Sequence, residues 1–307
     1  MREIVANSVV SLFLIMMIGV FSYKKGIITN EVNRGINNIL VKISLPMLIL
    51  SSFMTTFEDN MMDNVKMAFL FSVVALLLVF VASNILALCI KGSKKNAFIF
   101  CNIFTNTGFI GIPLLNAIYG SEGVIYGAAY SMFFNLFVFT YGMMLYKGFD
   151  KGDKFWRQIF EVFKNPVIVA VFIGIAVMFF SIPVPSNIQN SIKLIGSMTT
   201  PLSMMSIGFI LGQVKLKDYL GDWTLYYGLI IKLILLPLII ILFFRAIGNT
   251  STVANAIVFQ TALPAATLAS IFADRFNKER EYTTIFVVTS TLLSMLTIPI
   301  IVGIFFK

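Results

Sequence analysis

Long apolar runs with few or no charges, separated by short polar loops, fill almost the whole chain. A helix needs about 20 apolar residues to cross the hydrocarbon core of a bilayer, and ten runs fit that requirement with short connections between them. They cover residues 4–23, 31–57, 67–90, 96–121, 123–146, 165–183, 187–212, 223–244, 246–273 and 282–306. The pattern predicts an all-α integral membrane protein with ten transmembrane helices.

The fourth run contains the sequence N-I-F-T-N-T-G-F-I-G-I-P at residues 102–113. Pro113 lacks a backbone donor and clashes with the carbonyl four residues before it, and Gly108 and Gly111 loosen the same turn. We expect the helix to break at Pro113, in the middle of the membrane. Backbone groups freed at that depth need partners from protein, water or a ligand.

Polar side chains lie at the same level as this expected break. They belong to Asn102, Thr105, Asn106 and Thr107. These side chains could bind a ligand at the break. The alternative is a simple proline kink whose polar groups bond to neighbouring helices.

The ninth run repeats the arrangement, because Gln260 and Thr261 precede Pro264 and Ala265 follows it. We interpret Gln260 and Thr261 as the second half of a binding site. Three further polar residues, Asn135, Thr291 and Ser294, are weaker candidates, with hydrogen bonding between helices as their alternative role.

Two pairs of prolines indicate a duplicated unit. Pro113 and Pro264 are separated by nearly the same number of residues as Pro46 and Pro201, which we expect to kink the second and seventh helices. Paired interrupted helices in corresponding positions are the best sequence indication of a transporter site.

The duplication predicts two five-helix repeats, residues 1–147 and 164–307, joined by a short cytoplasmic connection at residues 148–163. Because five is odd, the second repeat enters the membrane from the opposite side. The repeats are therefore expected to be inverted, which is how alternating access is built.

Lysine and arginine gather in the loops after the first, third, fifth, seventh and ninth runs. The opposite side has only Arg2, Lys66, Arg245 and Lys307. The positive-inside rule then predicts a multi-pass protein of the cytoplasmic (inner) membrane with both termini extracytoplasmic. This distribution explains the net charge of +9 without nucleic acid as a partner.

One cation, Lys232, lies in the middle of the eighth run. Lys42 and Lys193 lie in amphipathic helix starts, where a long side chain can reach the interface. A charge at the depth of Lys232 costs at least about 2.5 kcal/mol, so it needs an interior partner. That partner is either the carbonyl end of a broken helix or the substrate.

The composition excludes several classes of protein. A hydrophobic fraction of 58% and a mean hydropathy of +0.92 are outside the range of soluble domains. The chain has no histidine, its two cysteines lack metal-binding or redox spacing, and its 14 acidic residues all lie in loops or at helix ends. We predict no enzyme, no metal and no cofactor. Without a central carboxylate, an anionic substrate is favoured and a carboxylate proton relay is not.

Four motifs resemble those of the auxin efflux carrier family, which includes plant PIN carriers and bacterial malate and malonate permeases. They are G-I-P-L-L-x-A-x-Y-G at residues 111–120, K-L-x-L-L-P at 232–237, L-P-A-A-T at 263–267 and S-T-L-L-S-x-L-T-I-P at 290–299. The resemblance covers nearly the whole chain.

The resemblance implies two inverted five-helix repeats, with helices 1, 2, 6 and 7 as a scaffold and helices 3–5 and 8–10 as a transport domain. It implies that helices 4 and 9 cross at Pro113 and Pro264, and that Asn106 binds the substrate carboxylate. Plant carriers have a polar residue where this chain has Ala265, and their long central loop is reduced here. A small carboxylate is therefore favoured over an indole-type substrate.

We predict secondary transport of a small mono- or dicarboxylate by alternating access. Amides at the starts of the half-helices, Asn106 and Lys232 would attract the anion. The alternatives are an anion channel and a carrier for an auxin-like aromatic carboxylate. The lipid bilayer is the other expected partner, and a face rich in Phe, Met and Ile could form a homodimer.

Overall fold

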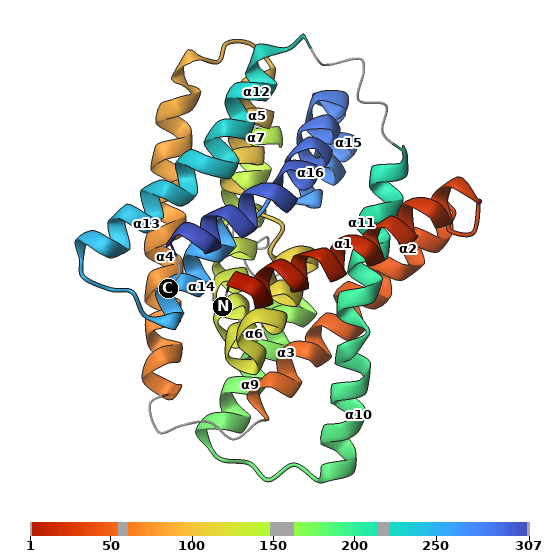
Figure 1. The fold of residues 1–307 in the computed structure, drawn as a ribbon, viewed down its shortest axis with the longest axis vertical. Helices are drawn as coiled ribbons and strands as arrows, with labels where there is room; N and C mark the ends of the chain where they lie inside the picture. Colours follow the sequence, from red (N-terminus) through yellow and green to blue (C-terminus); the bar gives the residue numbers. More distant parts are fainter. Residues whose placement is uncertain (1, 55–60, 148–162, 214–220, 306–307) are drawn as a thin grey trace. The chain divides into compact units, whose positions relative to one another are not determined.

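The computed structural model describes residues 2–54, 61–147, 163–213 and 221–305, and within these ranges every regular element is a helix (Figure 1). The α-helices of the first half are α1 (Arg2–Lys24), α2 (Asn30–Ile39), α3 (Leu45–Phe53), α4 (Met61–Leu86), α5 (Lys94–Ile103), α6 (Ile112–Phe137) and α7 (Met143–Lys147). Those that follow are α9 (Pro166–Phe179), α10 (Ser186–Ser197), α11 (Thr199–Gln213), α12 (Trp223–Ile230), α13 (Leu236–Ala246), α14 (Thr252–Thr261), α15 (Thr267–Phe276) and α16 (Arg280–Phe305).

Six helical stretches among the described residues are long and apolar enough to cross a membrane. They are Asn30–Phe53, Met61–Cys89, Thr107–Tyr146, Ser186–Gln213, Trp223–Ala246 and Arg280–Gly303. Val10–Lys24 and Pro166–Phe179 are shorter apolar helices at the first and sixth predicted spans. The protein is therefore a multi-pass membrane protein. Residues 148–162 of the predicted central connection lie outside the described residues.

The long stretch Thr107–Tyr146 is bent at Gly120, which has φ 60° and ψ −144°. Only glycine adopts this conformation readily. A Cβ on Gly123 would lie 2.8 Å from Cβ of Tyr119 and would also meet the carbonyl oxygen of Leu115. Residues eight apart in a straight helix are separated by about 12 Å, so the two arms of α6 fold back on one another.

Three prolines follow π-helical turns. The turns Leu40–Ser44, Thr107–Gly111 and Ile231–Leu235 precede Pro46, Pro113 and Pro237 respectively. A proline has no amide hydrogen to donate and its ring crowds the carbonyl four residues back. The wider turn moves that carbonyl away and lets the helix continue.

The predicted break of the fourth helix at Pro113 is therefore wrong. Pro113 is the second residue of α6, and the interruption lies earlier, at residues 104–106, between α5 and the π-helical turn. Of the two expected kinks, Pro46 is the second residue of α3, and Pro201 lies in the first turn of α11, just after α10 ends at Ser197.

The described contacts divide the chain into two compact units. The first contains residues 1–69, 108–132 and 163–213, and the second contains residues 70–107, 133–162 and 214–307. The first unit thus includes α1–α3 and α9–α11, and the second includes α5, α7, α12–α16 and most of α4.

Glycines bring α1 and α11 of the first unit into close contact (Figure 1). A Cβ on Gly208 would lie 2.9 Å from Cα of Gly19, and one on Gly212 would meet the ring of Tyr23. Small residues allow this approach of two backbones, and such contacts supply much of the packing energy between helices in lipid.

Hydrogen bonds between side chains join α2 and the π-helical turn after it to α11. Gln213 donates to Asn30 at 2.9 Å, Ser206 to Asn37 at 2.7 Å, and Thr199 to Ser44 at 3.1 Å. From one bond to the next, the residue number rises by seven on one helix and falls by seven on the other. Seven residues are about two helical turns, so the three bonds lie along one face of each of two antiparallel helices.

An ion pair joins α5 to α12 within the second unit. Lys94 Nζ lies 2.7 Å from Asp222 Oδ2, and Asp222 also accepts from the backbone amide of Thr224 as the N-cap of α12. Burial acts to raise the pKa of the Asp222 carboxyl, but these hydrogen bonds outweigh it and leave that pKa below its ordinary value. Lys94 belongs to one of the basic loops used to predict topology.

Candidate functional site

The first interruption follows α5. Phe104 has extended backbone angles (φ −91°, ψ 120°) and ends the helix, and helical structure resumes at Thr107. Threonine and asparagine hydrogen-bond readily to nearby backbone and so compete with helix formation. The T-N-T sequence at residues 105–107 therefore favours an interruption in front of the two glycines and Pro113.

The second interruption separates α14 from α15 and contains Pro264, as predicted. α14 ends at Thr261 and α15 begins at Thr267. Pro264 cannot donate a hydrogen bond, and it disfavours helical angles at Leu263.

The two interruptions are hydrogen-bonded to each other. The amide of Asn106 donates to the carbonyl of Pro264, and the amide of Ala266 donates to the carbonyl of Phe104, both at 2.9 Å. Thr105 and Ala265 form an antiparallel bridge between them. Each broken segment thus satisfies backbone groups of the other, which is what irregular backbone inside a membrane requires.

Ser290 of α16 supports the same pair, because the amide of Ala265 donates to its Oγ at 3.1 Å. Ser290 in turn donates to the carbonyl of Val287 at 2.9 Å. Sequence reasoning missed this role. The residue begins the S-T-L-L-S motif, but nothing in that motif distinguishes it from Thr291 and Ser294.

Six polar side chains at or next to the paired interruptions are at most 3% exposed. They are Asn102, Thr105, Asn106, Thr107, Gln260 and Thr261. Among the described residues, no hydrogen-bond partner reaches Nδ2 of Asn106, Oγ1 of Thr105, Oδ1 of Asn102 or either polar atom of the Gln260 amide. Buried polar groups are normally paired, so these atoms are available to a ligand.

Asn102 can be oriented without ambiguity. Its Nδ2 donates to the carbonyl of Phe98 at 2.9 Å, and exchanging the amide oxygen and nitrogen would lose that bond. Its Oδ1 is therefore an acceptor. Thr261, in contrast, donates to the carbonyl of Val258 at 2.7 Å, which is a bond within its own helix.

Lys232 lies in the π-helical turn Ile231–Leu235 and is 0% exposed. Its Nζ donates to the backbone carbonyl of Asn102 at 2.9 Å. Asn102 is next to the last residue of α5, where carbonyls lack helical partners and the helix dipole is negative. Of the two partners considered from the sequence, the structure provides the carbonyl end of the broken helix.

The remaining candidates are less directly connected. Thr291 donates to Val287 and Ser294 donates to Thr291, both at 2.7 Å within α16. Asn135 lies on α6 with a half-buried side chain, and its role stays a prediction. Lys42 and Lys193 are exposed.

Comparison with known proteins defines the class. A family model described as "Membrane transport protein" matches residues 4–155 and 152–302. An uncharacterised transporter of Methanocaldococcus jannaschii is 24% identical over 309 residues, covering 95% of this chain and 96% of the relative. The uncharacterised transporter YfdV of Escherichia coli is 23% identical over 299 residues, covering 94% of each chain.

A multi-pass helical protein that matches this model over nearly its full length is a membrane transport protein. It belongs to the auxin efflux carrier family, as the four sequence motifs predicted. The family description and the names of these relatives specify transport, and these names do not specify a substrate.

Proposed function

We propose that this protein is a secondary transporter, not an enzyme, that moves a small organic anion across the cytoplasmic membrane by alternating access. The observation that carries the proposal is the hydrogen-bonded pair of interruptions, beside which Nδ2 of Asn106 and the Gln260 amide are buried and have no hydrogen-bond partner among the described residues. Discontinuous helices that meet within the membrane are the usual framework of a transporter site.

In this proposal the anion is bound by side chains. The backbone amides of Asn106, Ala265 and Ala266 all donate to protein acceptors, so they are occupied in this structure. Among the described residues, Nδ2 of Asn106, Nε2 of Gln260 and the hydroxyl of Thr105 are donors left for a carboxylate. Lys232 contributes positive charge one residue from the end of α5.

The repeat architecture is part of the proposal. Ten spans in two inverted five-helix repeats, with helices 4 and 9 crossing, are supported by the two family-model matches, the fold-back of α6 at Gly120 and the paired interruptions. The first compact unit contains the predicted helices 1, 2, 6 and 7, which supports their grouping as a scaffold, and it also contains residues 108–132 of the predicted transport helices 4 and 5. Cytoplasmic basic loops and extracytoplasmic termini follow from the positive-inside rule.

The first experiment identifies a ligand. Purified protein is screened by thermal unfolding against mono- and dicarboxylates, because a ligand that binds only the folded state raises the unfolding temperature. Uptake of the best ligand is then measured in proteoliposomes.

Asn106→Ala tests the site. We expect the thermal shift and the uptake to be lost, while expression and the ligand-free unfolding temperature stay close to wild type. Asn38→Ala, at an exposed position on α2, is the matched control and should retain both activities. Unchanged binding and uptake in Asn106→Ala would reject this site, and single-channel current steps would reject the carrier mechanism.

A further inference from the structure

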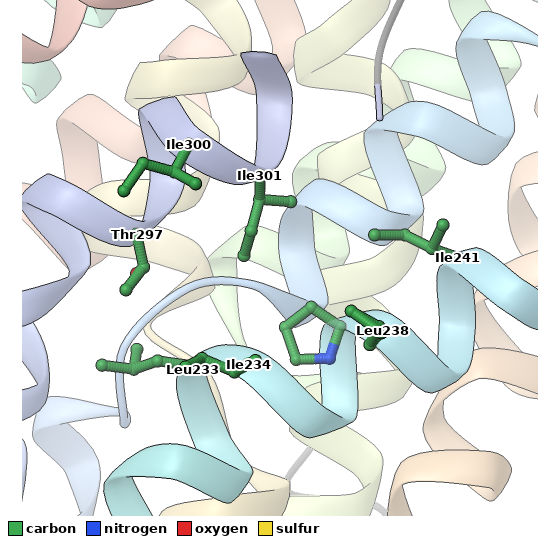
Figure 2. A pocket seen from close by; sticks show the side chains of 8 residues that line it. Leu233, Ile234, Leu238, Ile241, Thr297, Ile300 and Ile301 are labelled. Atoms are coloured by element: carbon green, nitrogen blue, oxygen red, sulfur yellow. The ribbon is translucent and has the colours of Figure 1, made fainter. Parts of the chain in front are cut away.

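An apolar pocket lies between α16 and the continuous helix formed by α12, the π-helical turn and α13. Its volume is about 290 Å³, which is at or below the lower limit of typical ligand pockets, about 300–1,000 Å³. Figure 2 shows Thr297 and Ile301 of α16 facing the same space as Leu238 and Ile241 of α13. The pocket is too small for a whole lipid and suits a segment of one extended chain.

The lining is hydrocarbon apart from one hydroxyl. Thr297 has the only polar side chain among the eight lining residues, and its Oγ1 has no hydrogen-bond partner in the described part of the chain. A water molecule needs two to four polar partners, and apolar cavities of this kind stay dry. Water is therefore an unsuitable occupant.

The pocket continues the surface that faces lipid. Both of its walls belong to stretches able to cross the membrane, Trp223–Ala246 and Arg280–Gly303. Two of its lining residues, Ile234 and Ile300, are 50% and 57% exposed, whereas Leu233 is 2% exposed. The pocket thus extends from exposed apolar side chains at its rim to buried ones inside. Because both walls belong to stretches able to cross a membrane, we expect acyl chains around that rim.

The same pocket touches the turn that carries Lys232. Leu233 and Ile234 follow Lys232 directly within the π-helical turn, and Pro237 also lines the pocket. Because Pro237 cannot donate to the carbonyl of Leu233, this segment lacks one bond of a regular helix. Side chains that line an empty pocket lack dispersion contacts on that side, and a ligand that fills the pocket would supply them.

We propose that this pocket binds a segment of a phospholipid acyl chain from the surrounding bilayer. The chain enters past Ile234 and Ile300 and packs against the π-helical turn that positions Lys232. This places a lipid contact next to the residue that holds the end of α5.

The test uses the full chain in vesicles of phosphatidylethanolamine and phosphatidylglycerol, with a trace of phosphatidylglycerol that carries a diazirine at the end of one acyl chain. Illumination inserts the label into whatever it touches, and mass spectrometry locates the adducts. Leu233, Ile241 and Ile301 are 2%, 4% and 9% exposed, so bulk lipid does not reach them. Leu242 and Leu296, at 58% and 66% exposed, report ordinary lipid contact.

We expect adducts on the three buried lining residues of the wild type. Thr297→Phe fills the pocket and should reduce these adducts at least tenfold without changing those at Leu242 and Leu296. Thr297→Val removes only the hydroxyl and should keep them. If Thr297→Phe does not fold, Leu238→Phe fills the pocket from the opposite wall.

Two results would overturn the proposal. One is an absence of adducts on the buried lining residues while Leu242 and Leu296 are labelled normally. The other is labelling of the buried residues that persists in every folded variant with a filled pocket.

Discussion

Replacing Lys232 by methionine separates two roles for the buried cation. The substitution keeps much of the side-chain volume but removes the donor to the carbonyl of Asn102, which lies 2.9 Å away. A hydrogen bond to a charged group contributes about 1.5–3 kcal/mol. A buried charge carries a desolvation penalty, and methionine removes that penalty together with the charge. The loss of global stability should therefore not exceed about 3 kcal/mol.

The local effect should be measurable by amide hydrogen exchange. If the end of α5 loses that bond, the free energy of opening around residues 104–107 falls by the same amount. Since each 1.4 kcal/mol changes an equilibrium tenfold, exchange there should accelerate by about 10- to 150-fold. Peptides from α11 in the other compact unit should exchange as in the wild type.

Lys193→Met is the matched control, because Lys193 is exposed on α10, and it should leave exchange at residues 104–107 unchanged. Wild-type exchange in Lys232→Met would refute the assignment of this lysine to the helix end. Accelerated exchange with full ligand affinity would assign it to the helix end alone, whereas an additional loss of affinity would show that its charge also serves the anion.

Three further substitutions and one control test the framework by thermal unfolding and hydrogen exchange. Gly208→Ala places a Cβ against the backbone of α1 and should lower the free energy of unfolding by about 1–3 kcal/mol; Gly35→Ala, with nothing within 4 Å of its new Cβ, should be neutral or slightly stabilising. Gly120→Ala forces a side chain into φ 60° and ψ −144° and should cost about 1–3 kcal/mol. Ser290→Ala leaves the amide of Ala265 without its acceptor, so exchange at that amide should accelerate by about 5- to 150-fold for a loss of 1–3 kcal/mol.

The apolar runs were sufficient to predict a multi-pass helical protein, and the motifs were sufficient to predict its family. The position of the first interruption was not predictable from proline chemistry alone. Pro113 is accommodated by the wider turn Thr107–Gly111. Sequence rules for proline do not predict that such a π-helical turn will form. The interruption falls instead where the T-N-T sequence can bond to a segment about 160 residues away, which is a tertiary effect.

The sequence reduced the possible partners of Lys232 to two but could not decide between them. Its depth required an interior partner, and both a helix end and an anion met that requirement. The hydrogen bond to Asn102 identifies the helix end. Ser290 could not be assigned because a serine that bonds its own helix and one that also accepts from another segment have the same sequence pattern.

Backbone pairing limits how a ligand would be recognised at the proposed site. One backbone hydrogen bond joins Asn106 to Pro264, and a second joins Ala266 to Phe104. Together these two bonds form a short ladder between the interruptions. Two broken helices can therefore persist in the membrane with no ligand present, since each segment satisfies the other. In the proposed site, specificity then falls to side-chain atoms that have no partner among the described residues, chiefly Nδ2 of Asn106 and both polar atoms of the Gln260 amide. A ligand that engaged the backbone amides would have to open the ladder, whereas one that pairs with the side chains gains bonds without losing any.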